Sequence, residues 1–304
     1  MKIGILGGGS IGLHLAAQLK MAGKEPVVIC RQRLQAESIR SNGLTYSRLD
    51  GSMENLKVHA IHIEETIPFD WVFLTVKQPQ IESAITYLHR LGERSFSLLC
   101  FQNGIGHEEA VMEELPEIPA YFAVTTEGSC KEGFTSVRHT GHGATWIGKW
   151  KAPVSADPKV EELLGLFERT DLQIIPEDNI RERVWKKLVI NACINPLTAL
   201  LGIKNGELLE SQYTLDAMTM LFEEAKRTAV LEDIKIDSQF MQEIVTVCRN
   251  TYGNKSSMLQ DIEAGRITEI QYINGAIERI AEKHGSSVFY HSLIVRLIQA
   301  KQQK

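Results

Sequence analysis

The stretch "KIGILGGGSIGLHLAAQLKMAG", residues 2–23, decides the fold of the N-terminal part of the chain. A short apolar run leads into glycines at positions 7, 9 and 12, and an amphipathic run then continues to Gly23. A strand, a G-x-G-x-x-G turn and a helix in this order are typical of the first unit of a dinucleotide-binding fold. Gly7 permits the tight turn, Gly9 lets the backbone approach a pyrophosphate, and Gly12 lets the helix pack on the strand. The alternative is a purely structural glycine turn.

The rest of the N-terminal part alternates between apolar and amphipathic runs. This alternation predicts a parallel, doubly wound sheet, because strands buried on both faces read as continuous apolar runs. Hairpins are expected at residues 44–61, turning at Asp50–Gly51, and at residues 135–150, turning around Gly141–Gly143. The expected strands cover residues 2–7, 25–31, 70–77, 96–104 and 119–130, and the expected helices cover residues 11–23 and 34–42.

After about Pro176 the pattern becomes helical with almost no strand signal. The expected helices are 179–201, 213–232, 239–250, 268–284 and 291–302. We therefore predict an α/β fold class, with an N-terminal Rossmann-type doubly wound sheet over residues 1–175 and an all-α domain over residues 176–304.

Composition limits the possible functions. The chain has 304 residues, 43% of them hydrophobic and 23% charged, with a net charge of −5, which is typical of a soluble globular protein. The absence of a long basic run argues against nucleic acid as a partner, and no apolar stretch is long enough to span a membrane. The odd number of cysteines, without a C-x-x-C pair, favours the reducing cytoplasm. They are Cys30, Cys100, Cys130, Cys193 and Cys248.

No metal site is expected from the sequence. The nine histidines are scattered, and the two close pairs lack a matching set of cysteines or carboxylates. A structural zinc site usually shows recurring ligand pairs. The two pairs are His59 with His62 and His139 with His142.

Polar residues after the later strands point to the nature of the nucleotide. Position 31, at the end of the expected second strand, is an arginine, where an NAD site carries an acid that binds the ribose 2′-hydroxyl. Arginine suits a 2′-phosphate, so Arg31 predicts NADPH over NADH. The alternative is that Arg31 and Arg33 are solvated surface charges. Lys77 and Asn103 lie at the ends of two further expected strands, at the edge where ligands bind in such sheets. The alternative for Lys77 is a solvated loop lysine.

The stretch "WKKLVINACINPLTALLGIKNGEL", residues 185–208, places polar residues in an apolar helix. Lys187, Asn191 and Asn195 are four residues apart and so lie along one helix face. Such groups cost about 1–3 kcal/mol each when buried without a partner, which indicates a binding function. The alternative is a hydrogen-bonded contact between helices. Pro196 is expected to kink or end the helix.

Taken together, these motifs resemble those of the ketopantoate reductase (2-dehydropantoate 2-reductase) family. The resemblance spans nearly the whole chain and is far more specific than the glycine motif alone. It implies a Rossmann half, a helical half, and reduction of 2-dehydropantoate to (R)-pantoate with NADPH in pantothenate and coenzyme A biosynthesis. The matching segments are the glycine motif, "VK" at 76–77, "QNG" at 102–104, "WKKLVINACINPLTAL", "NGEL" at 205–208 and "SSMLQDI…TEIQYING" at 256–275.

The resemblance also implies roles for individual residues. Lys187 matches the general acid, and Glu269 the acid near the reacting centre and the nicotinamide ribose. Ser129 is a weaker match because its flanks align poorly, and Pro79 stands where a larger residue is expected. The implied cofactor-binding residues are Gly7, Gly8, Gly9, Ser10, Ile11, Gly12, Arg31, Lys77, Asn103, Ser129 and Glu269. The implied substrate-binding residues are Asn103, Lys187, Asn191, Asn195, Asn205, Asn254 and Ser257.

The implied reaction explains these residue types. A lysine ammonium directed at the carbonyl oxygen stabilises the developing alkoxide and delivers a proton. Burial lowers the pKa of such a lysine, and a nearby carboxylate such as Glu269 opposes this effect. The expected small-molecule partner is 2-dehydropantoate, and a homodimer is a possible assembly. Two alternatives stay open: a reductase of another branched 2-keto acid, and a catalytically silent NADP(H)-binding sensor.

Overall fold

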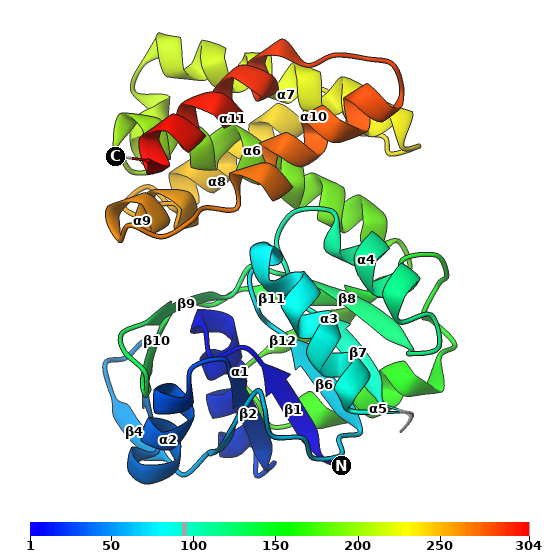
Figure 1. Ribbon diagram of the computed structural model, residues 1–304. Coiled ribbons are helices and arrows are strands. Elements are labelled where there is room, and N and C mark those ends of the chain that lie inside the picture. The colour runs from blue at the N-terminus through cyan, green and yellow to red at the C-terminus, as the bar shows by residue number, and fades with distance from the viewer. Residues whose placement is uncertain (93–95, 304) are drawn as a thin grey trace. The chain divides into compact units, whose positions relative to one another are not determined.

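The computed structural model describes residues 1–92 and 96–303 (Figure 1). The chain forms two compact units. Unit 1 comprises Met1–Gln102 and His107–Ile180, and unit 2 comprises Asn103–Gly106 and Arg181–Lys304. Compact units are defined by contacts rather than by independent folding, so the domain boundary between residues 175 and 176 stays a prediction.

Unit 1 is built on an eight-stranded sheet in the order β12-β11-β8-β7-β6-β1-β2-β5. Every neighbouring pair in this sheet is parallel except β8 with β11. Strands β1, β6 and β7 are buried along their whole length, as expected for a sheet covered on both faces. The predicted doubly wound sheet is therefore confirmed. The strands are β1 (Ile3–Leu6), β2 (Pro26–Cys30), β5 (His59–His62), β6 (Trp71–Leu74), β7 (Ser97–Cys100), β8 (Ala120–Thr125), β11 (Ala144–Gly148) and β12 (Gln173–Pro176).

The second sheet of unit 1 has the order β4-β3-β10-β9. Its strands are β3 (Leu44–Ser47), β4 (Met53–Leu56), β9 (Gly128–Lys131) and β10 (Ser136–Gly141). The predicted hairpin at residues 44–61 is confirmed, because β3 and β4 pair antiparallel. The predicted hairpin at residues 135–150 is wrong, because β10 belongs to this sheet whereas β11 pairs with β8 in the large one. Gly143 lies in the connection between them, and a Cβ there would lie 2.4 Å from the Thr126 carbonyl carbon.

Helix α1 (Ser10–Met21) contacts both sheets of unit 1, touching β1 and β2 on one side and β3, β9 and β10 on the other. Its residues Leu13 to Leu19 are buried, and several of them belong to the apolar core of this unit. Figure 1 shows α3 and α4 side by side, in agreement with their contacts. The remaining helices of unit 1 are α2 (Arg33–Asn42), the 3₁₀ turn η1 (Gln78–Gln80), α3 (Ile81–Arg90), α4 (His107–Glu114) and α5 (Pro158–Phe167).

Unit 2 is helical, as predicted. The described part of the chain has no helix that is both long and apolar enough to cross a membrane. Helices α7, α10 and α11 contact one another, and Figure 1 shows α10 and α11 running side by side. The predicted helix at 268–284 is divided into η3 and α10. The elements are α6 (Ile180–Leu201), η2 (Gly206–Leu209), α7 (Gln212–Leu231), α8 (Phe240–Asn250), α9 (Ser257–Glu263), η3 (Ile270–Tyr272), α10 (Asn274–Lys283) and α11 (Phe289–Gln302).

Candidate active site

The glycine turn between β1 and α1 has the geometry that a bound dinucleotide requires. Gly7 has a φ of +127°, and a Cβ there would lie 2.8 Å from Thr75 Oγ1. A Cβ on Gly12 would lie 1.9 Å from the Gly7 carbonyl oxygen, so close packing of helix on turn excludes a side chain. A Cβ on Gly9, in contrast, would meet nothing within 4 Å among the described residues. The turn is thus packed tightly against the protein at Gly7 and Gly12 and has open space at Gly9.

The start of α1 offers donors to a phosphate. Gly9 is the N-cap residue, and no side chain caps the helix there in the described structure. The first N–H groups of an α-helix have no acceptor within the helix, and together with the helix dipole they favour an anion. This arrangement and the open space at Gly9 fit the pyrophosphate of a nicotinamide dinucleotide.

Lys131 of β9 braces the glycine turn, and sequence reasoning missed this role. Its Nζ donates to the Gly8 carbonyl oxygen at 2.8 Å, and its backbone N–H donates to Ser10 Oγ at 3.1 Å. The Gln35 amide also donates to the Gly8 oxygen, at 2.9 Å. Burial lowers the pKa of Lys131. No sequence spacing signals these contacts, because Ser10 and Lys131 are 121 positions apart.

Ser129 lies two residues before Lys131 on β9, so the two side chains share a face of the strand. The Ser129 hydroxyl is buried and has no hydrogen-bond partner among the described residues. This hydroxyl lies on the same face of β9 as Lys131, which holds the glycine turn, and it is able to form a hydrogen bond with a ligand. The cofactor role of Ser129 stays a prediction.

The two arginines after β2 have different environments. Arg33 forms an exposed ion pair with Glu64 at 2.7 Å. Arg31 is also exposed, and within the described residues its guanidinium has no carboxylate within 4 Å. Its backbone carbonyl oxygen lies 3.0 Å from His62 Nε2, which fixes the backbone where the strand ends. Arg31 is thus the better candidate for a 2′-phosphate. Lys77, after β6, is half-buried and is the N-cap residue of η1, the turn that contains Pro79.

The "QNG" turn after β7 belongs largely to unit 2, because Asn103–Gly106 are part of that unit. Gly104 has a φ of +82°, and a Cβ there would lie 2.2 Å from the Tyr272 carbonyl oxygen. The Ile105 N–H donates to the same oxygen at 3.1 Å. The turn therefore packs on η3, which begins directly after Glu269. The structure groups Asn103 with the segment that carries this acid.

Lys187 of α6 and Glu269 interact electrostatically within unit 2. Lys187 is half-buried by accessible surface, and burial of its ammonium lowers its pKa to about 8. The Glu269 carboxylate opposes this shift, because a negative charge favours the ammonium form. Both effects were expected from the sequence. A lysine poised near neutral pH is suited to proton transfer.

The two amides of the predicted row lie further along α6. Asn191 is half-buried, and Asn195 is 7% exposed. One turn later, the Thr198 hydroxyl lies 2.7 Å from the Ser256 hydroxyl and within hydrogen-bond distance of the Asn195 carbonyl oxygen. Ser256 also caps α9 by accepting from the Leu259 N–H. The segment that carries Asn195 is therefore tied to the start of α9.

Ser257 begins α9, Asn254 lies in the loop between α8 and α9, and Asn205 lies directly before η2. Because Ser256 is the cap, Ser257 is left exposed as the first residue of α9. Asn205 N–H donates to the Asn254 carbonyl oxygen at 3.0 Å, and Asn205 Nδ2 donates to Thr251 Oγ1 at 3.0 Å. The buried Asn205 Oδ1 has no hydrogen-bond partner among the described residues. The structure thus joins Asn205 to Asn254 and leaves an amide oxygen that a substrate hydroxyl can satisfy.

Pro196 does not end α6, which continues to Leu201. Proline has no N–H, so the carbonyl oxygen four residues earlier, that of Ala192, loses its donor within the helix. Asn274 Nδ2 donates to this oxygen at 3.0 Å. A side chain from α10 thus replaces the missing backbone bond, and α6 continues past the proline to Leu201. Of the two outcomes expected at Pro196, a kink or an end, the structure excludes the end, in agreement with the expected helix over residues 179–201.

Comparison with known proteins agrees with this arrangement. Residues 3–152 match the family "Ketopantoate reductase PanE/ApbA", and residues 179–302 match "Ketopantoate reductase PanE/ApbA C terminal". A 2-dehydropantoate 2-reductase of Bacillus subtilis is 34% identical over 99% of this chain and 97% of its own. The crystal structure of a probable 2-dehydropantoate 2-reductase from Bacillus subtilis has a TM-score of 0.85 at 32% identity, covering 99% of this chain and 100% of that one.

A third neighbour is a D-mandelate dehydrogenase in a ternary structure with NADH and anilino(oxo)acetate. It has a TM-score of 0.90 at 26% identity and covers 100% of this chain and 99% of its own. The fold is therefore shared with an NADH-bound dehydrogenase as well as with the reductases, which supports a nicotinamide cofactor. The two family matches together cover most of the sequence, and the chain belongs to the ketopantoate reductase family of oxidoreductases.

Proposed function

We propose that this protein reduces 2-dehydropantoate to (R)-pantoate with NADPH, a step of pantothenate and coenzyme A biosynthesis. The observation that carries the proposal is Lys187, whose pKa of about 8 is set by burial and by Glu269, on a helix that also presents Asn191 and Asn195. The names of the relatives support the substrate. A catalytically silent sensor would have no need for a tuned lysine beside a carboxylate.

NADPH, when bound, supplies the hydride to the 2-keto carbon. The chain's own residues bind and orient it. The glycine turn and the start of α1 bind the pyrophosphate, Lys131 holds Gly8 in position, and Arg31 binds the 2′-phosphate. Lys77, Asn103, Ser129 and Glu269 are the further residues that we propose for the cofactor, with Glu269 on the nicotinamide ribose.

Lys187 acts on the substrate oxygen. As the carbonyl carbon is reduced, negative charge grows on its oxygen, and the ammonium stabilises that charge and transfers a proton from Nζ. Below pH 8 the ammonium is the major form, so the proton is present when it is needed. Glu269 keeps the lysine from losing that proton too early.

The amides and Ser257 position the rest of the substrate. Asparagine both donates and accepts hydrogen bonds without adding charge, which suits a molecule with a carboxylate, a ketone and a hydroxyl. We assign Asn191, Asn195 and Asn205 to these polar groups. Asn103, Asn254 and Ser257 complete the proposed set of substrate-binding residues.

The pH dependence tests the role of Glu269. We expect kcat/KM for reduction to fall as the pH rises through about 8, because only the protonated lysine can donate. Glu269 raises the pKa of Lys187, so Glu269→Gln should move this descending limb to lower pH. Glu263→Gln is the control, because Glu263 pairs with Lys255 on the surface and should leave the profile in place. An unchanged profile in Glu269→Gln would remove Glu269 from the pair.

The choice of cofactor tests Arg31. Arg31→Ala should raise the KM for NADPH about tenfold or more, because a hydrogen bond to a charged group is worth about 1.5–3 kcal/mol, and should change the KM for NADH little. Arg33→Ala is the matched control, since it removes only an exposed ion pair of small energetic value. Equal effects of Arg31→Ala on both cofactors would contradict a contact with the 2′-phosphate.

Rates with a panel of 2-keto acids test the substrate. Steady-state kcat/KM should be highest for 2-dehydropantoate and much lower for an aromatic keto acid such as phenylglyoxylate, the oxidised form of mandelate. That comparison matters because a D-mandelate dehydrogenase shares the fold. Comparable rates on unrelated keto acids would reject the assignment to 2-dehydropantoate.

We also propose that the protein acts in the cytoplasm. All five cysteines are free, four of them buried, which supports a reducing compartment. The homodimer stays a prediction, and sedimentation of the purified chain would test it.

A further inference from the structure

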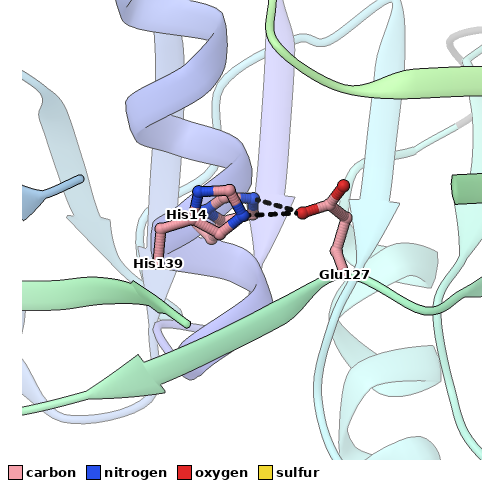
Figure 2. Close-up of side chains that lie close together, drawn as sticks. All are labelled: His14, Glu127 and His139. Atoms are coloured by element: carbon pink, nitrogen blue, oxygen red, sulfur yellow. Dashed lines mark hydrogen bonds and ion pairs between the residues drawn. The ribbon is translucent and has the colours of Figure 1, made fainter. Parts of the chain in front are cut away.

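Three residues far apart in the sequence come together inside unit 1. His14 lies on α1, Glu127 lies between β8 and β9, and His139 lies on β10. One ligand atom from each residue lies within 4.8 Å of the others. Figure 2 shows both imidazole rings directed at the same carboxylate oxygen. Glu127 Oε2 lies 2.9 Å from His139 Nε2 and 3.7 Å from His14 Nε2.

His14 is 1% exposed, and its Nε2 has no hydrogen-bond partner among the described residues. The other ring nitrogen, Nδ1, lies 3.2 Å from the Tyr46 hydroxyl, which accepts from Gln18 Nε2 at 3.0 Å. The contact of Nδ1 with Tyr46 therefore fixes the ring orientation, while Nε2 points toward Glu127 without a hydrogen bond. Metal-binding histidines have this arrangement, in which the second nitrogen bonds to an outer partner that fixes the tautomer and the orientation.

The environment supplies both the buried negative charge and the unpartnered nitrogen that a cation needs. The Glu127 side chain is 4% exposed, and its Oε1 accepts from the Gly143 N–H at 2.9 Å. The buried His14 ring offers Nε2, which has no hydrogen-bond partner among the described residues, toward this carboxylate. A divalent cation between the two would balance the buried negative charge and would bind His14 Nε2.

We propose that His14, Glu127 and His139 form a binding site for Zn²⁺. Zinc takes imidazole nitrogens and carboxylate oxygens at about 2.0–2.2 Å in a tetrahedron, so its ligand atoms lie about 3.4 Å apart. The two separations from Glu127 Oε2, 2.9 and 3.7 Å, lie on either side of this value. Each of these two separations differs from the ideal by about half an ångström or less, and the ligand atoms of the two histidines lie within 4.8 Å of each other, so they would move closer when the ion binds.

The fourth position falls to water or to His142. The exposed His142 ring packs edge-on against His139, with the ring centroids 4.8 Å apart. This proposal differs from the expectation of no metal, which rested on the lack of a carboxylate to match His139 and His142. The fold provides that carboxylate and a third histidine. Because its ligands come from α1, β10 and the β8–β9 turn, the ion would link helix α1 to the second sheet of unit 1.

The test is zinc binding by the full chain after treatment with a chelator and dialysis. Calorimetric titration with Zn²⁺ should give one ion per chain, and zinc should raise the melting temperature. Glu127→Gln and His14→Gln should each weaken binding at least a hundredfold. Tyr46→Phe keeps all three ligands but removes the hydroxyl that contacts His14 Nδ1 and accepts from Gln18, and it should weaken zinc binding about tenfold to a hundredfold.

His62→Gln is the matched control, because His62 is also buried beside a carboxylate, with 3.3 Å to Glu64, but belongs to no group of three possible ligands among the described residues. It should bind zinc as the wild type does. If a ligand variant fails to fold, the absorption spectrum of wild-type protein with Co²⁺ in place of Zn²⁺ still reports tetrahedral coordination. No binding by the wild type, or equal affinity in wild type and Glu127→Gln, would overturn the proposal.

Discussion

Lys187→Ala is expected to lower kcat for 2-dehydropantoate reduction by about two to four orders of magnitude, the usual range for loss of a positioned acid. The substitution removes both the proton and the positive charge that stabilises the developing alkoxide. The affinity for NADPH should stay nearly unchanged, because Lys187 is not among the residues that we propose for the cofactor, and the glycine turn and Arg31, which we propose for its phosphates, are left intact. Loss of nicotinamide absorbance in single turnovers, with cofactor binding measured separately, distinguishes these two effects.

Two further variants sharpen this experiment. Lys187→Arg keeps the positive charge but cannot give up a proton near neutral pH. The difference in kcat between Lys187→Arg and the wild type therefore measures proton donation, and the difference between Lys187→Arg and Lys187→Ala measures electrostatic stabilisation. Lys186→Ala is the matched control. Lys186 is the adjacent lysine of α6, and its Nζ pairs with Glu182 at 2.6 Å one turn earlier. A surface pair of this kind contributes little, so turnover should stay near normal. Near-normal turnover in Lys187→Ala itself would remove Lys187 as the acid.

The fold was largely predictable because its signals are local. The glycine turn, the apolar strands and the helical periods each involve residues close in sequence, and the structure confirms the doubly wound sheet and the helical C-terminal part. The failed hairpin at residues 135–150 shows the limit of such signals. A turn near Gly141 is visible in the sequence, but the partner of each strand depends on distant β3 and β8.

The candidate site was predictable only where residues share one helix or match a family motif. The row on α6 and the glycine turn were found in this way. Lys131, which holds Gly8 from β9, was not, since a lysine after a strand is usually a solvated residue. The cluster of His14, Glu127 and His139 was also missed, because its residues are far apart in the sequence. Each residue is unremarkable in its own segment, and only the packing of α1 on the small sheet joins them.

Asn274 has a structural role that the sequence also did not reveal, and Asn274→Ala should lower the free energy of unfolding by about 2–4 kcal/mol. Its Nδ2 donates to the Ala192 carbonyl oxygen and lies 3.0 Å from His291 Nδ1, and its side chain is fully buried. The alanine variant leaves both acceptors without this donor, and a buried polar group without a partner costs about 1–3 kcal/mol. Urea denaturation of both proteins measures the difference.

A double-mutant cycle with Pro196→Ala identifies the cause of that loss. An alanine at position 196 restores the backbone N–H that bonds to Ala192 within α6, so Asn274→Ala should cost about 1 kcal/mol less in this background than in the wild type. The part of the cost that comes from His291 should remain in both backgrounds, because Pro196 does not bond to that ring. Independent substitutions add to within about 0.3–0.5 kcal/mol. Additivity within that limit would show that Asn274 does not replace the bond that Pro196 removes, and that α6 passes the proline by some other means.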